Sequence, residues 1–274
     1  MSFIKRVVRG FTAPIFKERI VSRTKRVPRG PVTRKILTGA DSSPEALFYA
    51  TGQPVFSIPV SRLRYFGGLA FFYDQHHFMQ YYKEGPAALV RYYKRHQPGN
   101  IFEKHFLPTP ANRHLPHKGI SGNPWLFGVP WLYTHDTGTY NGGEKGLGPE
   151  HGIQAYGPVT NEKIMLETRR LSDVLKSIKK TGFKPDVLGG YPRGYFLMDL
   201  KGRWSFLLDA GLHRVAALVH LGYRRIPVQF QTAFPRVIKQ AESRQWPMVK
   251  KRYLSEKEAV DIFMQYLKPD GLKA

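Results

Sequence analysis

The stretch 207–228, LLDAGLHRVAALVHLGYRRIPV, constrains the fold more than any other part of this chain. It starts with apolar residues that have no polar face, as expected of a strand that is covered on both sides. The residues Asp-Ala-Gly at 209–211 interrupt the strand. From Leu212 the apolar residues recur at helical spacing up to Gly222, which stands where a helix C-cap is expected. Ile-Pro-Val at 226–228 is extended again, so we predict a strand, a tight turn, a short helix and a second strand.

The turn before this helix has the chemistry of a phosphate site. Gly211 permits a positive φ or the close approach of an anion to the backbone. The first amides of the helix, at 212–214, have no intrahelical partner, and the helix dipole favours an anion beside them. His213 and Arg214 add donors at the same end, and an arginine can bind two phosphate oxygens at once. The alternative is an ordinary turn glycine followed by a solvated cation.

Three sequence patterns here resemble the ParB/sulfiredoxin superfamily. They are Gly-Leu-His-Arg at 211–214, Leu-Gly at 221–222 and Ile-Pro-Val at 226–228. Upstream, Arg-Leu at 170–171 followed by SIKKTGF at 177–183 is similar to the helix that precedes this turn in the family. The resemblance covers residues 157–232. It implies an α+β fold with a ParB/sulfiredoxin-like mixed sheet, and ATP or another nucleotide as ligand, with Mg²⁺ as a candidate cofactor.

The resemblance also implies functional residues. Related small-molecule kinases of the superfamily use a glutamate near the nucleotide as catalytic base, and Glu167 is the candidate here because it is close to the Arg-Leu motif. Asp209 is a second candidate, as Mg²⁺ ligand or base, and plain N-capping is its alternative. The alternative for Glu167 is a surface ion pair with Arg170. The predicted catalytic residues are Glu167, Asp209 and His213, and the predicted nucleotide-binding residues are Gly211, Leu212, His213, Arg214, Arg170 and Arg193.

The net charge, the lack of cysteine and two absent motifs limit which partners and which protein classes are possible. The formal net charge of +23 implies an anionic partner, which can be a nucleotide, a nucleic acid, an anionic glycan or a membrane surface. The chain has no cysteine, which excludes disulfides, thiolate metal sites and the cysteine-dependent reaction of the sulfiredoxins. No P-loop motif occurs. No convincing helix-turn-helix follows residue 232, which argues against a role in chromosome partitioning.

The rest of the chain divides into three further segments. Residues 1–40 form a basic arm, for which we consider a membrane-surface helix over 1–37, a targeting sequence or a packed arm. Residues 41–156 are predicted to be an aromatic-rich, mostly helical N-terminal module that ends in a Gly- and Pro-rich stretch. This stretch, 107–158, is expected to close over the nucleotide, to receive the second substrate or to be a structural wrap. Residues 233–274 are predicted to be helices packed on the core.

Several local signals predict individual elements. Helices are expected from Ser43, over 86–96, from Thr160 to about 181, over 235–246, and after the capping box at 255–258. A hairpin is expected with strands over 194–200 and 203–208 and a turn at Lys201 and Gly202.

These observations favour a nucleotide-binding, kinase-like phosphotransferase that acts on a small-molecule or glycan hydroxyl. The alternative is a nucleic-acid-binding or nucleotide-gated, CTPase-type ParB-like protein without kinase activity. No apolar run is long enough for a transmembrane helix. We expect a cytoplasmic protein, with peripheral attachment to a membrane as an option.

Overall fold

A mixed sheet of seven strands is the framework of the fold. The computed structural model describes residues 36–65, 68–98, 103, 129–132 and 146–269. The strands are β1 (Ile36–Leu37), β2 (Val55–Pro59), β3 (Leu63–Arg64), β4 (Arg193–Met198), β5 (Trp204–Ala210), β6 (Arg225–Phe230) and β7 (Val237–Lys239). Their order is β1-β2-β6-β4-β5-β3, and β7 also pairs with β4. The pairs β2–β6 and β4–β5 are antiparallel, and the others are parallel.

The chain divides into two units, Met1–Thr33 and Arg34–Ala274. The first unit, and with it nearly all of the predicted basic arm, lies outside the described residues. Within the described part, no helix is both long and apolar enough to cross a bilayer.

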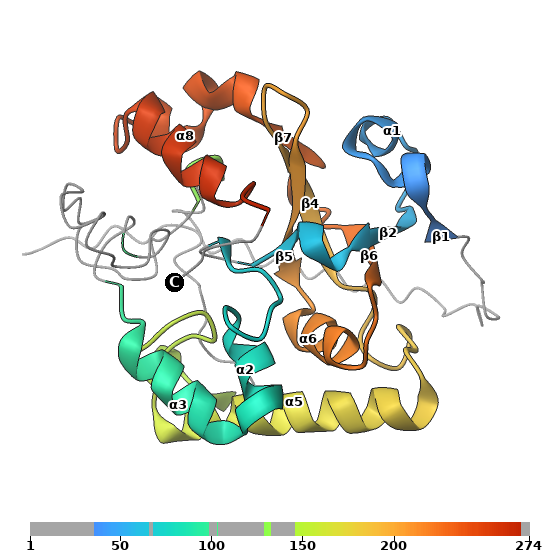
Figure 1. The fold of residues 1–274 in the computed structure, drawn as a ribbon. Coiled ribbons are helices and arrows are strands. Elements are labelled where there is room, and N and C mark those ends of the chain that lie inside the picture. Colours follow the sequence, from blue (N-terminus) through green and yellow to red (C-terminus); the bar gives the residue numbers. More distant parts are fainter. Residues whose placement is uncertain (1–35, 66–67, 99–102, 104–128, 133–145, 270–274) are drawn as a thin grey trace, which may run out of the picture. The chain divides into compact units, whose positions relative to one another are not determined.

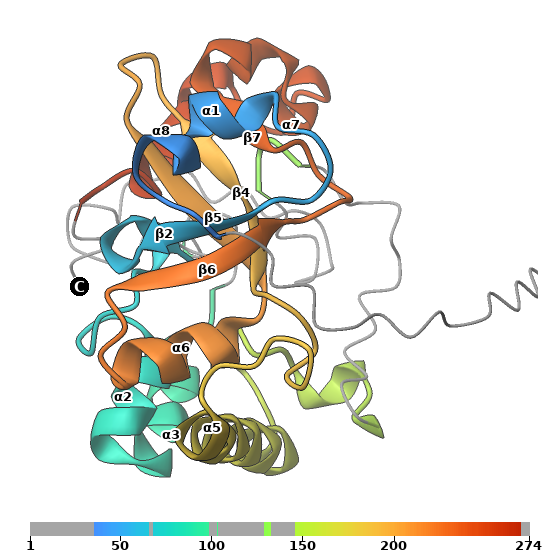
Figure 2. The ribbon, with the colours of Figure 1, turned by 90° about the vertical axis from the view of Figure 1, so that its right-hand side faces the viewer.

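Helices gather on both sides of the sheet. They are α1 (Pro44–Phe48), α2 (His77–Glu84), α3 (Pro86–Arg95), α5 (Asn161–Thr181), α6 (Leu212–His220), α7 (Pro247–Lys250) and α8 (Glu256–Gln265). Figures 1 and 2 show α6 between the sheet and the long helix α5, with α2 and α3 beside α5. In both views α8 lies on the opposite side of the sheet from α5. The α+β class with a mixed sheet is therefore confirmed.

The predicted hairpin is confirmed, and its turn is held by one carboxylate. β4 pairs with β5 in a register that places Tyr195 opposite Leu207. The Asp199 carboxylate accepts hydrogen bonds from the backbone amides of Lys201 and Arg203, at 2.9 and 2.8 Å. These bonds fix the turn, because they satisfy the amides that the strand ladder leaves without partners.

Aromatic side chains fill the core behind this hairpin. The rings of Phe56, Phe196, Phe206 and Phe230 lie with centroids 4.8 to 5.9 Å apart in their contacts, and all four are at most 1% exposed. Such clusters add edge-to-face attraction to the burial of apolar area. The four rings come from four strands, so they fix the strands of the sheet to one another.

Four of the five local helix signals are confirmed. Ser43 and Thr160 cap α1 and α5 with their side chains, and Ser255 with Glu258 forms the capping box of α8. The helix predicted over 86–96 is α3.

Two predictions need correction. The expectation of a mostly helical module over 41–156 missed β2 and β3, which pair with β6 and β5 of the segment 157–232. The helix predicted over 235–246 is wrong, because β7 occupies Val237–Lys239 and a 3₁₀ helix follows at Gln240–Gln245. In both places a short segment with buried apolar residues pairs with a strand that is distant in the sequence, which a local pattern does not show.

Candidate functional site

The N-terminal end of α6 has the backbone geometry that the sequence predicts. Gly211 is the N-cap, with φ 89° and ψ 20°, in the left-handed region. Asp209 is therefore not the N-cap. A Cβ on Gly211 would lie 2.8 Å from the Cα of Pro192 and 2.9 Å from Nη2 of Arg214. Both the conformation and the close packing require glycine at this position.

Arg214 ties this helix end to the preceding loop. Its Nη1 donates hydrogen bonds to the carbonyl oxygens of Leu188, at 3.1 Å, and Gly190. Burial lowers the pKa of the Arg214 guanidinium, and the charge of Arg193 lowers it further. Two cations therefore lie close enough to repel each other at the positive end of a helix dipole.

Glu167 is the centre of a buried ionic network that joins α5 to α6. Its carboxylate is 0% exposed and contacts side-chain nitrogen atoms of three residues, Lys163, Arg170 and His213. Oε2 lies 2.5 Å from Nε2 of His213, and Oε1 lies 3.0 Å from Nζ of Lys163 and 3.3 Å from Nη1 of Arg170. The alternative of a surface ion pair between Glu167 and Arg170 does not fit this burial.

The electrostatics of this network keep Glu167 ionised. Burial acts to raise the pKa of its carboxyl, but the hydrogen bond from His213 and the charges of His213, Lys163 and Arg170 together lower it to about 2. A carboxylate with no exposed surface and such a low pKa is suited to orienting His213 rather than to accepting a proton from a substrate.

Two further histidines are buried beside this network. His76 and His77 are both 0% exposed and stack on each other with ring centroids 4.8 Å apart. His76 Nδ1 accepts a hydrogen bond from the amide of Phe78, whose ring lies 4.6 Å from that of His213. Burial and the charge of His213 lower the pKa of His76 to about 3, and burial lowers that of His77 well below its usual value. Both imidazoles are therefore neutral parts of the core.

The structure brings the predicted residues together in two groups. The first group is the buried network, which holds Glu167, Arg170 and His213. The second is the α6 end, with Gly211, Leu212, Arg214 and Arg193. Asp209 belongs to neither group. Its Oδ2 instead accepts a hydrogen bond from Nε2 of Gln231, at 2.5 Å.

His213 and Leu212 differ from expectation in their surroundings. The His213 imidazole is bonded toward α5, and the Leu212 side chain is 2% exposed. Their contribution to an anion site is thus limited to the backbone amides. Sequence reasoning missed Lys163, although its position four residues before Glu167 on one helix was a usable signal.

Most of the predicted Gly- and Pro-rich loop over 107–158 lies outside the described residues. A described part at 129–132 packs into the core: Trp131 is 3% exposed, and its Nε1 donates to the Tyr195 hydroxyl at 3.1 Å. For this part a structural role is favoured.

Comparisons with known proteins add no assignment. No family model matches the sequence, and neither the curated proteins nor the solved structures give a match. Within the described residues, no group of three or more His, Cys, Asp or Glu side chains is arranged to hold a metal ion.

Proposed function

We propose that the N-terminal end of α6 binds the phosphates of a nucleotide such as ATP, and that the chain is a kinase-like phosphotransferase of ParB/sulfiredoxin-like fold. One observation carries the proposal. Arg193 pairs in the sheet with Ala210, next to the N-cap Gly211 of α6, and Arg214 lies in the first turn of that helix. Neither arginine forms an ion pair with a carboxylate of the described residues. A phosphate at this end would compensate both positive charges and accept hydrogen bonds from the first amides of the helix.

The local backbone also supports the proposal of a phosphate site. The amides of Leu212 and His213 follow a left-handed glycine, and the loop that ends at Arg193 lies against the same helix end. Arg214 is held by the carbonyl groups of Leu188 and Gly190, so its position is fixed before a ligand arrives. Such pre-organisation lowers the entropy cost of binding.

The proposal assigns different roles to the acidic residues. Glu167 is a positioning residue that fixes His213, because its carboxylate is buried and ionised. Asp209 is half-buried near the end of β5, close in sequence to Gly211, and is the better candidate for the base. Asp209 would take the proton of an acceptor hydroxyl while that oxygen bonds to the transferred phosphorus and the bond from phosphorus to the nucleotide breaks.

The acceptor in this proposal is a small-molecule or glycan hydroxyl. A metal has no preformed group of ligands among the described residues, so we assign no step to Mg²⁺. The positive charge of the chain favours an acidic acceptor.

The proposal is tested by nucleotide binding to the full chain and to an Arg193→Ala variant. Arg193 is exposed, so its removal leaves the core intact. Thermal shift and calorimetry with ATP, ADP, CTP and GTP, with and without Mg²⁺, should give stabilisation by at least one nucleotide. We expect Arg193→Ala to weaken that binding about tenfold, the effect of losing one charge-assisted hydrogen bond.

Arg95→Ala, which removes an exposed arginine from the end of α3, is the matched control. Equal affinities of the two variants, or no stabilisation by any nucleotide, would overturn the proposal. Binding without transfer of phosphate to any acceptor would instead favour the nucleotide-gated alternative.

A further inference from the structure

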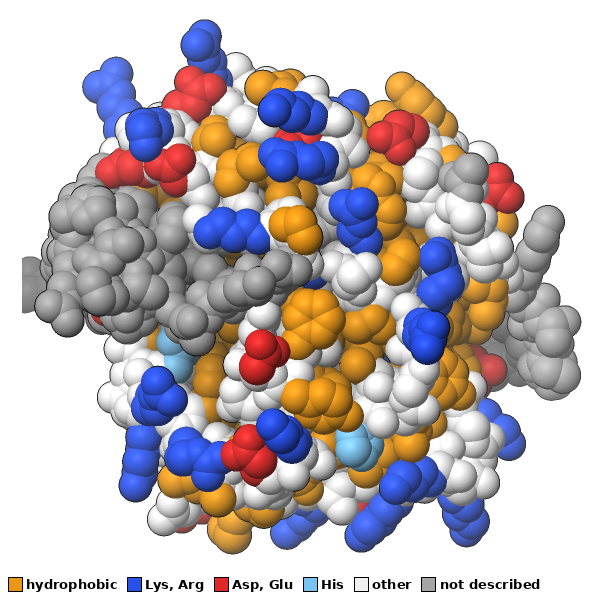
Figure 3. All heavy atoms as spheres, viewed as in Figure 1, with side chains coloured by type: hydrophobic (Ala, Val, Ile, Leu, Met, Phe, Trp, Pro, Cys, Tyr) orange, Lys and Arg blue, Asp and Glu red, His pale blue; other side chains and the backbone are white. Residues whose placement is uncertain are grey.

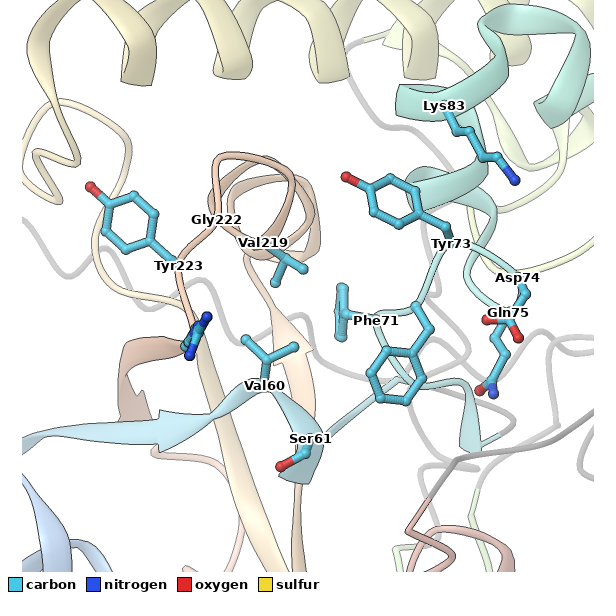
Figure 4. A pocket seen from close by; sticks show the side chains of 12 residues that line it. Val60, Ser61, Phe71, Tyr73, Asp74, Gln75, Lys83, Val219, Gly222 and Tyr223 are labelled. Atoms are coloured by element: carbon cyan, nitrogen blue, oxygen red, sulfur yellow. The ribbon is translucent and has the colours of Figure 1, made fainter.

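A cleft of about 840 Å³ opens beside the other end of α6. Its walls come from the residues around β3, from the segment 71–75 before α2, from Lys83 of α2, and from 219–224 at the end of α6. Figure 4 shows the side chains of Val60, Val219 and Phe71 close together in it. The volume is within the range of small-ligand sites.

Aromatic side chains stand exposed in this cleft. Tyr73 is 40% exposed and Tyr223 is 41% exposed, whereas Phe71, which also lines the cleft, is 1% exposed. The hydroxyl of Tyr73 lies 2.9 Å from Nδ1 of His220. The ring of His220 in turn stacks on Tyr82, with centroids 4.7 Å apart. Tyr73 is therefore held in place as a flat platform before any ligand binds.

The cleft is also cationic. Lys83 and Arg224 are exposed, come from different elements, and form no ion pair with any described carboxylate. Asp74 is the single acid among the lining residues. Figure 3 shows one face of the molecule, with hydrophobic side chains in its middle, a few Asp and Glu side chains beside them, and Lys and Arg side chains around them. A ligand that fits must offer both a flat apolar surface and negative charge.

We propose that this cleft binds single-stranded nucleic acid. Each nucleotide of a single strand combines a flat base, which stacks on a tyrosine, with a phosphate, which pairs with Lys83 or Arg224. Stacking accepts any base, and Ser61 and Asp74 offer hydrogen-bonding groups to base edges. The net charge of +23 favours the approach of such a strand.

This site is separate from the proposed phosphate site. The helix α6 runs from Leu212 to His220, so its two ends lie about 12 Å apart at the usual rise per residue. The cleft continues beyond the far end, at Gly222 to Arg224. The two proposals therefore fail or succeed independently, and Arg193→Ala should leave binding at the cleft unchanged.

The test is the affinity of the full chain for a fluorescently labelled oligo-dT, measured by anisotropy. The salt concentration is set high enough to suppress non-specific phosphate contacts. We expect the double variant Tyr73→Ala/Tyr223→Ala to bind at least about tenfold more weakly, as the loss of base stacking predicts. The matched control is Tyr49→Ala/Tyr253→Ala, which removes two exposed tyrosines outside the lining. Equal affinity of the two double variants would overturn the proposal.

A second measurement does not depend on folding of the variants. An oligonucleotide with 5-iodouridine is photocrosslinked to the unaltered chain, and the crosslinked peptides are identified by mass spectrometry. We expect crosslinks at Tyr73 or Tyr223 and competition by unlabelled single strand. Crosslinks only elsewhere, or equally strong competition by duplex DNA or by heparin, would show a general polyanion surface and would contradict the proposal.

Discussion

The side chains at one end of α6 bind other groups of the protein, whereas the residues at the other end face an open cleft. At the N-terminal end the protein uses its own groups: Arg214 binds loop carbonyls, and Glu167 binds His213 and Lys163. At the C-terminal end, Tyr223 and Arg224 face an open cleft. At the first end the side chains of His213 and Arg214 are therefore fixed by other groups of the protein, whereas at the second end the side chains are accessible, and substitutions at the two ends should differ accordingly.

The largest expected effect is at the buried ionic network. Glu167→Gln removes the charge that compensates Lys163, which is 1% exposed, and leaves a buried cation beside a neutral amide. Breaking a buried pair in this way costs about 3–5 kcal/mol of unfolding free energy. Urea denaturation at pH 7 measures it.

The control for this prediction is Asp261→Asn, which breaks an exposed pair with Lys257 on α8. It should leave the denaturation midpoint close to that of the unaltered chain, because exposed pairs are screened by solvent. Similar midpoints for the two variants would show that Glu167 is not held as tightly as its contacts indicate.

The next effect compares the glycines at the two ends directly. Gly211→Ala places a Cβ 2.8 Å from the Pro192 backbone in addition to left-handed strain, so we expect a loss of at least about 2 kcal/mol in unfolding free energy. Gly222→Ala has the same kind of strain, with φ 88°, but no atom within 4 Å of the added carbon. We expect Gly222→Ala to lower the free energy of unfolding by about 1 kcal/mol. Equal losses in chemical denaturation would refute the tight packing at the N-terminal end.

Features that depend on residues close together in the sequence could be predicted, whereas features that depend on distant residues could not. The strand, the left-handed Gly211 and the helix of 207–228 were predictable, because turn and cap preferences are local. Pairing of β2 with β6 was not, because it joins residues far apart in the chain. For the same reason the sequence suggested Glu167 and His213 separately but could not show that they share a hydrogen bond.

A pH titration separates the buried histidines from Glu167. His76 has a folded pKa of about 3 against 6.5 in the unfolded chain, so the unfolded state binds the proton first. Above pH 6.5 the buried neutral His76 does not reduce the free energy of unfolding. Below pH 6.5 the free energy of unfolding falls by about 1.4 kcal/mol for each pH unit, until the pH reaches about 3. Glu167 has a folded pKa of about 2, so its protonation in the unfolded chain lowers the free energy of unfolding further only below pH 4.5.

The variant for this titration is His76→Asn, because asparagine keeps an N-cap acceptor for the amide of Phe78 and does not titrate. The decline between pH 6.5 and 4.5 should become shallower in denaturation curves, with His77 still contributing. An unchanged slope would show that His76 is not buried as a neutral group.

The smallest expected effect is at the open end of α6. Tyr73→Phe removes the hydrogen bond to His220 but keeps the ring, and the bond is between partly exposed groups. Such a bond contributes at most about 1 kcal/mol to unfolding free energy. The variant should therefore fold like the unaltered chain and differ only in how well the ring is held, which oligonucleotide anisotropy would detect as a slight loss of affinity. A loss of stability as large as that of Gly211→Ala would mean that Tyr73 is a structural residue and that the two ends of α6 are alike.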